Sequence, residues 1–409
     1  MKKYVATILI LLFISFDYIY STDLTFELIN KVVLDSLINT VEELSGQKRV
    51  LINGVDTIIQ KRNFKSTGNI LASQYLIEQG EKYKYEISYQ TVAETCTSVF
   101  WERKGATDSN KILIIGAHYD SENFDDKDGK SDLLSPGADD NASGVAAIIE
   151  IARILENYQP DFTIKFVFWD EEEKGSKGSK YYAKNAKDTK QNIIMNLNLD
   201  MLAWDSNNDG LLRLKYTYDI ISLRFADSVV KICEQYKLKL KILRVVNDYM
   251  GFIGDGDWFW YNGFAVIGLA DCKDYMERYH TQLDLIEPFN RDYFLENTKL
   301  AIAIISKFGY DQTTSNIESS EGVSKNISIY PNPASDFIEV FCNVDFTNNN
   351  PNSVNNSVAG NICIYNTLGE TVMCTGSRFS ESVRIDVSYL PLGLYFVRNG
   401  NKVNKFIKI

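Results

Sequence analysis

Four apolar runs separated by longer amphipathic stretches constrain the fold of this chain most. The runs cover residues 111–118, 163–170, 192–201 and 264–271. The first run, KILIIGAH, shows no alternation of apolar and polar residues, which is typical of a strand buried on both faces. Apolar residues at helical spacing follow in residues 143–158, 222–238 and 291–308. Strands that alternate with helices predict an α/β domain with a mostly parallel central sheet and helices on both faces.

The N-terminal twenty residues have the pattern of a secretory signal peptide. Lys2 and Lys3 precede an apolar stretch at residues 5–16 that is too short to span a bilayer comfortably. The usual small residues before a cleavage site are missing, so an uncleaved anchor stays an alternative. No other stretch is apolar and long enough to cross a membrane, and after removal of residues 1–20 we expect no stable membrane span.

The residue composition and the pattern of apolar residues change after the α/β region. Residues 312–325 are rich in Ser, Thr, Asn and Glu, as in a linker. Residues 326–409 hold short alternating runs between Asn- and Gly-rich turns, which predicts a small β-sandwich. The sequence therefore divides into a signal peptide (1–20), a catalytic domain (21–311), a linker (312–325) and a C-terminal β-domain (326–409).

Charge and cysteine content limit the possible partners. The chain carries 43 Lys and Arg against 54 Asp and Glu, a net charge of -11, and has no basic stripe. A nucleic-acid partner is excluded because phosphate binding needs clustered cations. The six cysteines show no CxxC spacing. They can form disulfides after export, but the sequence does not determine which cysteines pair.

Candidate metal ligands follow the predicted strands. The chain has only two histidines. They and the carboxylates that follow each strand are His118, Asp139, Asp140, Glu171, Glu172, Glu173, Asp200 and His280. A single histidine is more often structural, and an acidic run such as WDEEE is by itself more often a solvated face. The carboxyl ends of parallel strands, however, meet at one edge of a sheet, and crowded anions of zinc-ligand type repel unless cations lie between them. The pattern predicts a metal site, with two ions.

Five ordered motifs carry a family resemblance. GAHYDS, PGADDNASGVAAIIEIAR, EEKGSKGS, LDM and YHTQLD closely resemble the co-catalytic zinc aminopeptidases of the bacterial leucyl-aminopeptidase type. The resemblance covers about residues 44–307, and RNFKSTGNILASQYL looks like the N-terminal helix of that family. It implies a secreted metallo-aminopeptidase with two zinc ions, which acts on peptides with a free N-terminus because one metal can bind the α-amine.

The resemblance also implies roles for individual residues. Asp139 would bridge both ions, Glu173 and His280 would complete one site, and His118 and Asp200 the other. Glu172 would be the general acid/base, and Asp120 would orient the imidazole of His118. The bond between Asp139 and Asp140 is expected to be cis. Because three glutamates run together, these assignments place Glu171 outside the site, and a slip by one residue would shift both glutamate roles.

One stretch departs from the family pattern. Where the family often has Ser-Asp-His, this chain has Gly-Asp-Gly at residues 254–256, and the usual Pro is Ala265. The aromatic residues that follow, Trp258, Phe259 and Trp260, either line the substrate pocket or pack in the core.

The C-terminal region carries a second resemblance. NISIYPNPASDFIEV, IYNTLGETV and LPLGLYFVRNGNKVNKFIKI resemble the C-terminal sorting domains of type IX secretion. This implies handling by the type IX machinery and release, or attachment to the outer cell surface. The alternative is a β-sandwich that binds or stabilises.

Two other functions remain as alternatives. A glutaminyl cyclase shares the fold with one zinc but usually breaks the paired aspartates of GADDN, which are intact in this chain. A non-catalytic surface binding protein would normally show losses among the ligands or the base, and none is lost.

Overall fold

The computed structural model describes two folded parts of the chain. The first covers residues 23–310 apart from 93, 127–130, 248–252 and 272–276. The second covers residues 327–409 apart from 331–333, 343–357, 360–361, 376–377, 380–381 and 400–401. The predicted signal peptide and linker lie outside the described residues. Among those described, no helix has the length and apolarity needed to span a bilayer.

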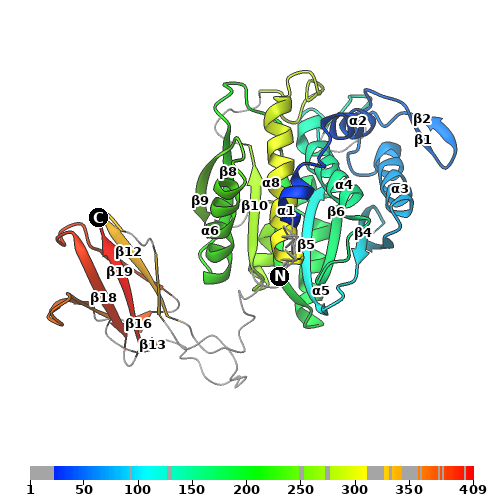
Figure 1. The fold of residues 1–409 in the computed structure, drawn as a ribbon. Helices are drawn as coiled ribbons and strands as arrows, with labels where there is room; N and C mark the ends of the chain where they lie inside the picture. The colour runs from blue at the N-terminus through cyan, green and yellow to red at the C-terminus, as the bar shows by residue number, and fades with distance from the viewer. Residues whose placement is uncertain are drawn as a thin grey trace, which may run out of the picture.

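A mixed eight-stranded sheet forms the centre of the first part (Figure 1). Its order is β3-β4-β6-β5-β7-β10-β8-β9. The strands are β3 (Glu86–Val92), β4 (Cys96–Arg103), β5 (Asp108–His118), β6 (Phe162–Trp169), β7 (Asn192–Asp200), β8 (Leu211–Thr217), β9 (Lys241–Asn247) and β10 (Val266–Ala270). The four central strands, β6, β5, β7 and β10, run parallel, and antiparallel pairs occur toward the edges, at β3–β4, β4–β6 and β10–β8. The predicted α/β fold with a largely parallel core is confirmed.

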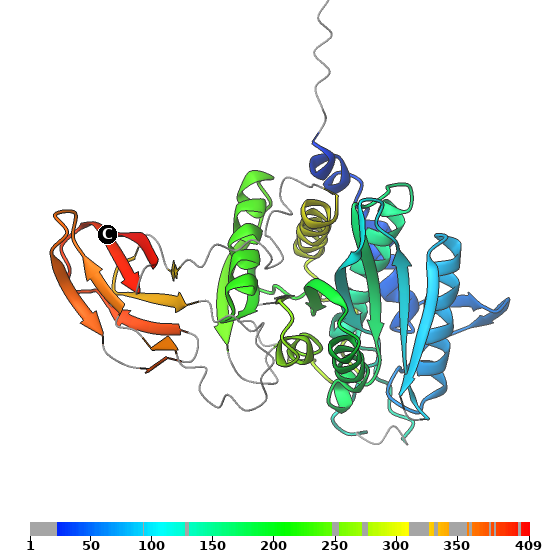
Figure 2. The same cartoon turned by 90° about the horizontal axis from the view of Figure 1, so that it is seen from below.

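Helices cover both faces of this sheet (Figure 2). They are α1 (Leu24–Ile29), α2 (Leu34–Leu44), α3 (Thr67–Lys82), α4 (Gly144–Leu155), α5 (Lys177–Asp188), α6 (Ile220–Gln235), α7 (Gly256–Tyr261) and α8 (Arg291–Gly309). Alternate residues of one strand face different helices. Leu113 and Ile115 of β5 join the core formed with α4 and α8, whereas Ile114 joins a second core formed with α5 and α7. Burial on both faces explains why the β5 sequence is apolar without alternation.

A short hairpin precedes the sheet. It consists of β1 (Val50–Ile52) and β2 (Val55–Thr57). The next helix, α3, covers only residues 67–76 of the segment 62–76 that was predicted as the N-terminal helix. It begins after Ser66, whose hydroxyl accepts a hydrogen bond from the Asn69 N–H at 3.0 Å.

The second part is built from short antiparallel strands. They are β11 (Ile327–Tyr330), β12 (Phe337–Cys342), β13 (Val358–Ala359), β14 (Ile362–Tyr365), β15 (Thr371–Thr375), β16 (Arg378–Phe379), β17 (Ser382–Asp386), β18 (Gly393–Asn399) and β19 (Lys402–Lys408). The sheets β11-β12-β17 and β15-β14-β18-β19 share one apolar core, to which Val340 and Ile364 belong. Two sheets around one core agree with the predicted β-sandwich. Cys363 and Cys374 form a disulfide across β14 and β15, whereas Cys96 and Cys233 are buried free thiols.

Candidate active site

The candidate site lies where the central parallel strands end. His118 is the last residue of β5 and Asp200 the last of β7. Glu172 and Glu173 follow β6 in a short 3₁₀ turn, and His280 lies in the segment between β10 and α8. The loops at the carboxyl ends of these strands therefore bring together residues that are up to 162 positions apart in the sequence.

Asp140 stands between the two histidines. Its Oδ1 lies 3.2 Å from Nε2 of His118, and its Oδ2 lies 2.9 Å from Nε2 of His280. Asp200 Oδ1 is 3.5 Å from the same nitrogen of His118, and Glu173 Oε1 is 2.9 Å from the same nitrogen of His280. Each histidine thus has a carboxylate of its own and shares Asp140 with the other.

The structure contradicts the prediction for Asp139. The side chain of Asp139 turns away from both histidines, and its Oδ1 accepts the N–H of Ala203 at 2.9 Å. The cis peptide bond joins Asp140 to Asn141, not Asp139 to Asp140. The sequence prediction was thus displaced by one residue, because three consecutive polar residues leave the register open. Asp140 is the candidate shared ligand.

Asn141 also fixes the start of helix α4. Its Oδ1 accepts the N–H of Gly144 at 3.0 Å, and its Nδ2 donates to the carbonyl of Leu199 at 2.9 Å. The hydroxyl of Ser143 donates to the carbonyl of Asp139 at 2.7 Å. Both side chains tie the segment that carries Asp140 to α4.

The donor atoms fit a metal better than they fit one another. Glu173 Oε1 and His280 Nε2 are buried and only 2.9 Å apart, yet neither has a hydrogen-bond partner among the described residues. Buried polar atoms are normally satisfied, so these two atoms lack the group that would bind them. The ligand atoms of His118, Asp140 and Asp200 lie within 4.8 Å of one another. Imidazole nitrogen and carboxylate oxygen are zinc ligands.

The electrostatics agree with a site for cations. Burial lowers the pKa of His280, but Asp140 and Glu173 outweigh it and raise this pKa to about 10. Burial raises the pKa of Asp140, and the two histidines hold it below its usual value instead. Burial and the neighbouring Asp140 raise the pKa of Glu173 well above its usual value. In the protein without metal, the carboxylates are therefore neutralised only by the positive charges of the two histidines. Bound metal ions would supply this positive charge instead.

The three consecutive glutamates are separated by their contacts. Glu171 is fully buried outside the cluster, where its Oε1 accepts the hydroxyl of Thr95 at 2.6 Å and its Oε2 pairs with Lys177. Glu172 adjoins the cluster, since one of its carboxylate oxygens lies within 4.8 Å of ligand atoms of His118 and Glu173. Among the described residues, only the hydroxyl of Ser176, at 3.3 Å, donates to this carboxylate. Burial, partly opposed by His118, raises the pKa of Glu172 to about 7. Glu172 and Glu173 thus adjoin the cluster, and Glu171 does not.

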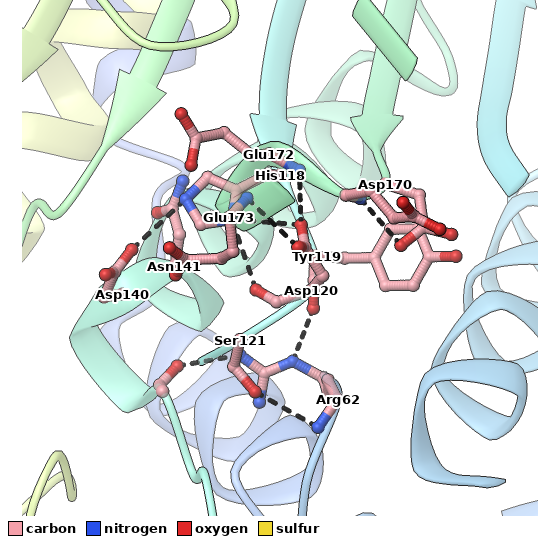
Figure 3. Close-up of polar contacts among 12 residues, drawn as sticks. Arg62, His118, Tyr119, Asp120, Ser121, Asp140, Asn141, Asp170, Glu172 and Glu173 are labelled. Carbon is pink, nitrogen blue, oxygen red and sulfur yellow. Dashed lines mark hydrogen bonds and ion pairs between the residues drawn. The ribbon is translucent and has the colours of Figure 1, made fainter. Parts of the chain in front are cut away.

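Asp120 supports both parts of the cluster (Figure 3). Its Oδ1 and Oδ2 accept the backbone N–H groups of Glu172 and Glu173 at 3.1 and 3.3 Å. Its Oδ1 also lies 3.4 Å from Nδ1 of His118, on the side of the ring opposite to Asp140. Asp120 thus contacts the glutamate turn as well as the imidazole of His118.

Asp284 is a contributor that the sequence argument quoted only as part of a motif. Its Oδ1 and Oδ2 accept the backbone N–H groups of Asp139 and Asp140 at 2.9 and 3.1 Å. It lies four residues after His280, so it connects the loop of His280 to the loop of Asp140. The signal was present in YHTQLD, but a motif does not show which atoms a carboxylate contacts.

The sequence analysis did not assign the aromatic residues around His280 to the site. The Tyr279 ring stacks on the imidazole at 3.7 Å between centroids, and the Phe124 ring lies 4.8 Å away. The Phe124 N–H also donates to the carbonyl of His280 at 2.9 Å.

Glu122, in the same loop as Phe124, has a ligand atom within 4.8 Å of those of Glu173 and His280, and it pairs with Lys174 at 2.7 Å.

At residues 254–256, where the sequence departs from the family pattern, the backbone lies against the cluster of candidate ligands. Gly254 has a φ of +64°, and a Cβ at this position would lie 3.3 Å from Glu172 Oε1 and from Asp200 Oδ2. Phe259 is fully buried in the core under α5 and α7, against which Trp258 and Trp260 also pack. The structure thus supports the core-packing interpretation of these aromatics.

A largely parallel α/β sheet with histidines and carboxylates paired at its carboxyl edge is the arrangement of a metal-dependent hydrolase. The chain belongs to peptidase family M28, which it matches over residues 98–305, just over half of its length. Residues 328–409 match the secretion system C-terminal sorting domain, which indicates export to the extracellular space or the cell surface by the type IX route.

Curated relatives match parts of the catalytic region. A probable zinc metalloprotease of Pyrenophora teres f. teres (strain 0-1) is 39% identical over 114 residues, which are 28% of this chain and 24% of the relative. A probable leucine aminopeptidase 2 of Aspergillus oryzae is 26% identical over 256 residues, which cover 56% of this chain and 46% of the relative. The chain thus spans less than half of the length of these relatives.

Solved structures share the fold. LapB from Legionella pneumophila is 20% identical with a TM-score of 0.57, and the match covers 70% of this chain and 75% of LapB. BSAP, a zinc aminopeptidase from Bacillus subtilis, is 14% identical with a TM-score of 0.56, covering 69% of this chain and 96% of BSAP.

Proposed function

We propose that this chain is an exported aminopeptidase that removes N-terminal residues from peptides and holds two zinc ions. The observation that carries the proposal is the position of Asp140 between two histidines, each of which has a further carboxylate. Asp140 would bind both ions, Glu173 and His280 would complete one site, and His118 and Asp200 the other. A glutaminyl cyclase with one zinc ion would need only one histidine with its carboxylate, and not two such pairs.

Glu172 would carry the proton in the reaction. When bound, the two zinc ions would supply Lewis acidity that polarises the scissile carbonyl, activates water at neutral pH and holds the free α-amine of the substrate. Glu172 faces the ligands without being one of them, and its pKa of about 7 suits a group that accepts a proton from water and later gives it to the leaving amine. Asp120 would keep the Glu172 turn and the His118 ring in place, since it contacts both.

The two parts of the chain would have separate tasks. The part around the candidate site would be the catalytic domain, at about residues 21–311, after removal of a signal peptide. The β-domain at about residues 326–409, joined by a linker, would be handled by the type IX machinery, and the described residues of this domain include no histidine.

Hydrolysis of Leu-p-nitroanilide, beside its N-acetylated form, tests the proposal on the purified full chain. We expect cleavage of the free amine only, about two zinc ions per chain, and loss of activity on chelation. Glu172→Gln should abolish turnover with zinc retained, whereas Glu171→Gln, which changes the neighbouring glutamate outside the cluster, should not. Cyclisation of an N-terminal glutamine with one zinc bound would establish the cyclase alternative. A chain that binds no zinc would overturn the site assignment.

A further inference from the structure

Arg62, which lies between β2 and α3, has a guanidinium that is fully buried beneath the candidate site. Among the described residues it donates only to backbone carbonyls, with Nε to Tyr119 at 2.6 Å and Nη2 to Gly137 at 2.8 Å. Its Nη1 donates to Leu44 and Pro136 at 2.6 and 2.5 Å. Two of these segments carry candidate ligands, since Tyr119 follows His118 and Gly137 comes three residues before Asp140. Figure 3 shows Arg62 beside the loop that holds Asp120 and Ser121.

The backbone of Arg62 is tied to the same loop. Its N–H donates to the hydroxyl oxygen of Ser121 at 3.1 Å, and its carbonyl accepts from Nδ2 of Asn69 at 3.0 Å. The Ser121 hydroxyl in turn donates to the carbonyl of Ser135 at 2.7 Å. The main chain and the side chain of Arg62 therefore both connect the loop after β5 with the segment that leads to Asp140.

The turn at Gly137 packs directly on the guanidinium. Gly137 has a φ of +52°, and a Cβ there would lie 2.9 Å from Nη2 of Arg62 and 2.3 Å from the carbonyl oxygen of Asp140. Only a glycine fits both the backbone conformation and the space. The close approach brings two carbonyls of one turn, those of Pro136 and Gly137, within reach of a single guanidinium.

The charge of Arg62 points to more than local packing. No carboxylate lies within 4.0 Å of its nitrogens in the described part of the chain, although a buried charge normally has a counter-ion. The carboxylates that stabilise its charge most, after the cost of burial, are Asp284, Asp120, Asp140 and Glu173. All four belong to the candidate site or support it directly.

We propose that Arg62 is a positioning residue that clamps the loop after β5 against the turn before Asp140 and so sets the spacing of His118 and Asp140 for metal binding. A planar guanidinium has five N–H donors in a fixed fork and can hold all four of these carbonyls, whereas an ammonium group has only three donors and no fixed fork. The inference rests on the proposed ligand assignment and adds to it a residue that touches neither metal nor substrate.

Amide hydrogen exchange on the metal-free full chain tests the clamp without any reaction. Arg62→Met should speed exchange at least tenfold in residues 118–121 and 136–141, with the centre of β5 unchanged. Arg153→Met is the matched control, because Arg153 also donates to a backbone carbonyl, that of Lys31 at 3.1 Å, and pairs with Glu150 away from the site. This control should leave both loops protected even if it melts at a lower temperature.

Zinc affinity and kinetics complete the test. Loss of a group that orients ligands typically weakens metal binding by about 10- to 100-fold, so Arg62→Met should raise the zinc Kd by that factor. The peptidase activity of Arg62→Met should also fall, through a lower kcat with an unchanged KM. Arg62→Lys, which keeps the charge, is the second variant in case Arg62→Met does not fold, and we expect it to bind zinc at least several-fold more weakly than the unchanged protein.

Two results would overturn the clamp. One is an Arg62→Lys variant with unchanged zinc Kd and unchanged exchange. The other is loop exchange that rises equally in Arg153→Met, which would assign a general role in stability to Arg62. If the chain binds no zinc at all, the proposed function fails, and the exchange experiment still decides whether Arg62 joins the two loops.

Discussion

Exchange of Asp140 for Asn is the perturbation that separates the structure from the sequence motif. The family resemblance implied Asp139 of GADDN as the shared ligand, whereas in the structure Asp140 lies between the histidines, at 2.9 and 3.2 Å from their Nε2 atoms. Asn has nearly the volume of Asp and can still accept a hydrogen bond, but it carries no charge. Asp140→Asn therefore removes one negative charge from between the two candidate ion positions.

The size of the effect follows from the distances. An ion bound beside these nitrogens would lie within about 4 Å of the lost charge, where a pair of unit charges interacts by about 4 kcal/mol near a protein surface. Since about 1.4 kcal/mol is a factor of ten, we expect zinc to bind about a thousandfold more weakly. The matched variant Asp139→Asn should change zinc binding by less than about tenfold, because Asp139 Oδ1 accepts a backbone N–H outside the cluster.

Competition with a chromophoric zinc chelator measures both constants on purified full-length protein. Zinc content after dialysis and hydrolysis of Leu-p-nitroanilide provide two further readouts, and thermal melting shows whether each variant is folded. Asp139→Asn weakening zinc binding as much as Asp140→Asn would refute the reasoning. So would an Asp140→Asn variant that keeps two tightly bound ions and full activity.

Three further predictions use other parts of the chain. Glu172→Gln should lower kcat by about 10²- to 10⁴-fold with zinc content unchanged, and because the active form is the carboxylate, kcat/KM should fall as the pH drops below about 7, whereas Glu171→Gln should keep that profile. Burial raises the pKa of Asp284 to about 7, so in the metal-free chain its share of stability should be complete below about pH 4 and lost as the pH rises through about 7. Denaturant titrations should show a smaller loss over this pH range in Asp284→Asn than in the unchanged protein, because the pKa of Glu172 is also raised to about 7 and its share remains. Reduction of Cys363–Cys374 should destabilise the β-domain by about 3 kcal/mol without changing zinc content, as reductant-dependent melting would show.

Much of the fold could be predicted because burial acts on whole segments. The run at residues 111–118 coincides with the end of β5, and it is apolar because its alternate residues face two different cores. Residues 291–308 likewise correspond to α8. The edge strands β3, which pairs antiparallel with β4, and β9, which pairs parallel with β8, were not predicted. Edge strands are covered less evenly, and β3 exposes Ser88 and Tyr89, so that no strong apolar pattern marks it.

The site could be predicted as a set of residues and not as a geometry. The residue pattern alone gave eight candidates, and the resemblance to the zinc aminopeptidases implied His118, Glu173, Asp200 and His280 among them. The choice between Asp139 and Asp140 depends on one backbone turn. A turn of this kind reverses the direction of a side chain within one residue, and no periodicity in the sequence records it.

The contacts of the buried carboxylates show how the site separates support from metal binding. Asp120 and Asp284 each accept two backbone N–H groups, from the turn of Glu172 and Glu173 and from the segment of Asp139 and Asp140. A carboxylate whose oxygens are occupied by N–H groups is held in place and has less capacity for a cation. Glu173 Oε1, by contrast, is buried with no hydrogen-bond donor among the described residues. One group of carboxylates therefore accepts backbone N–H groups, and the other group would be free to bind the proposed zinc ions.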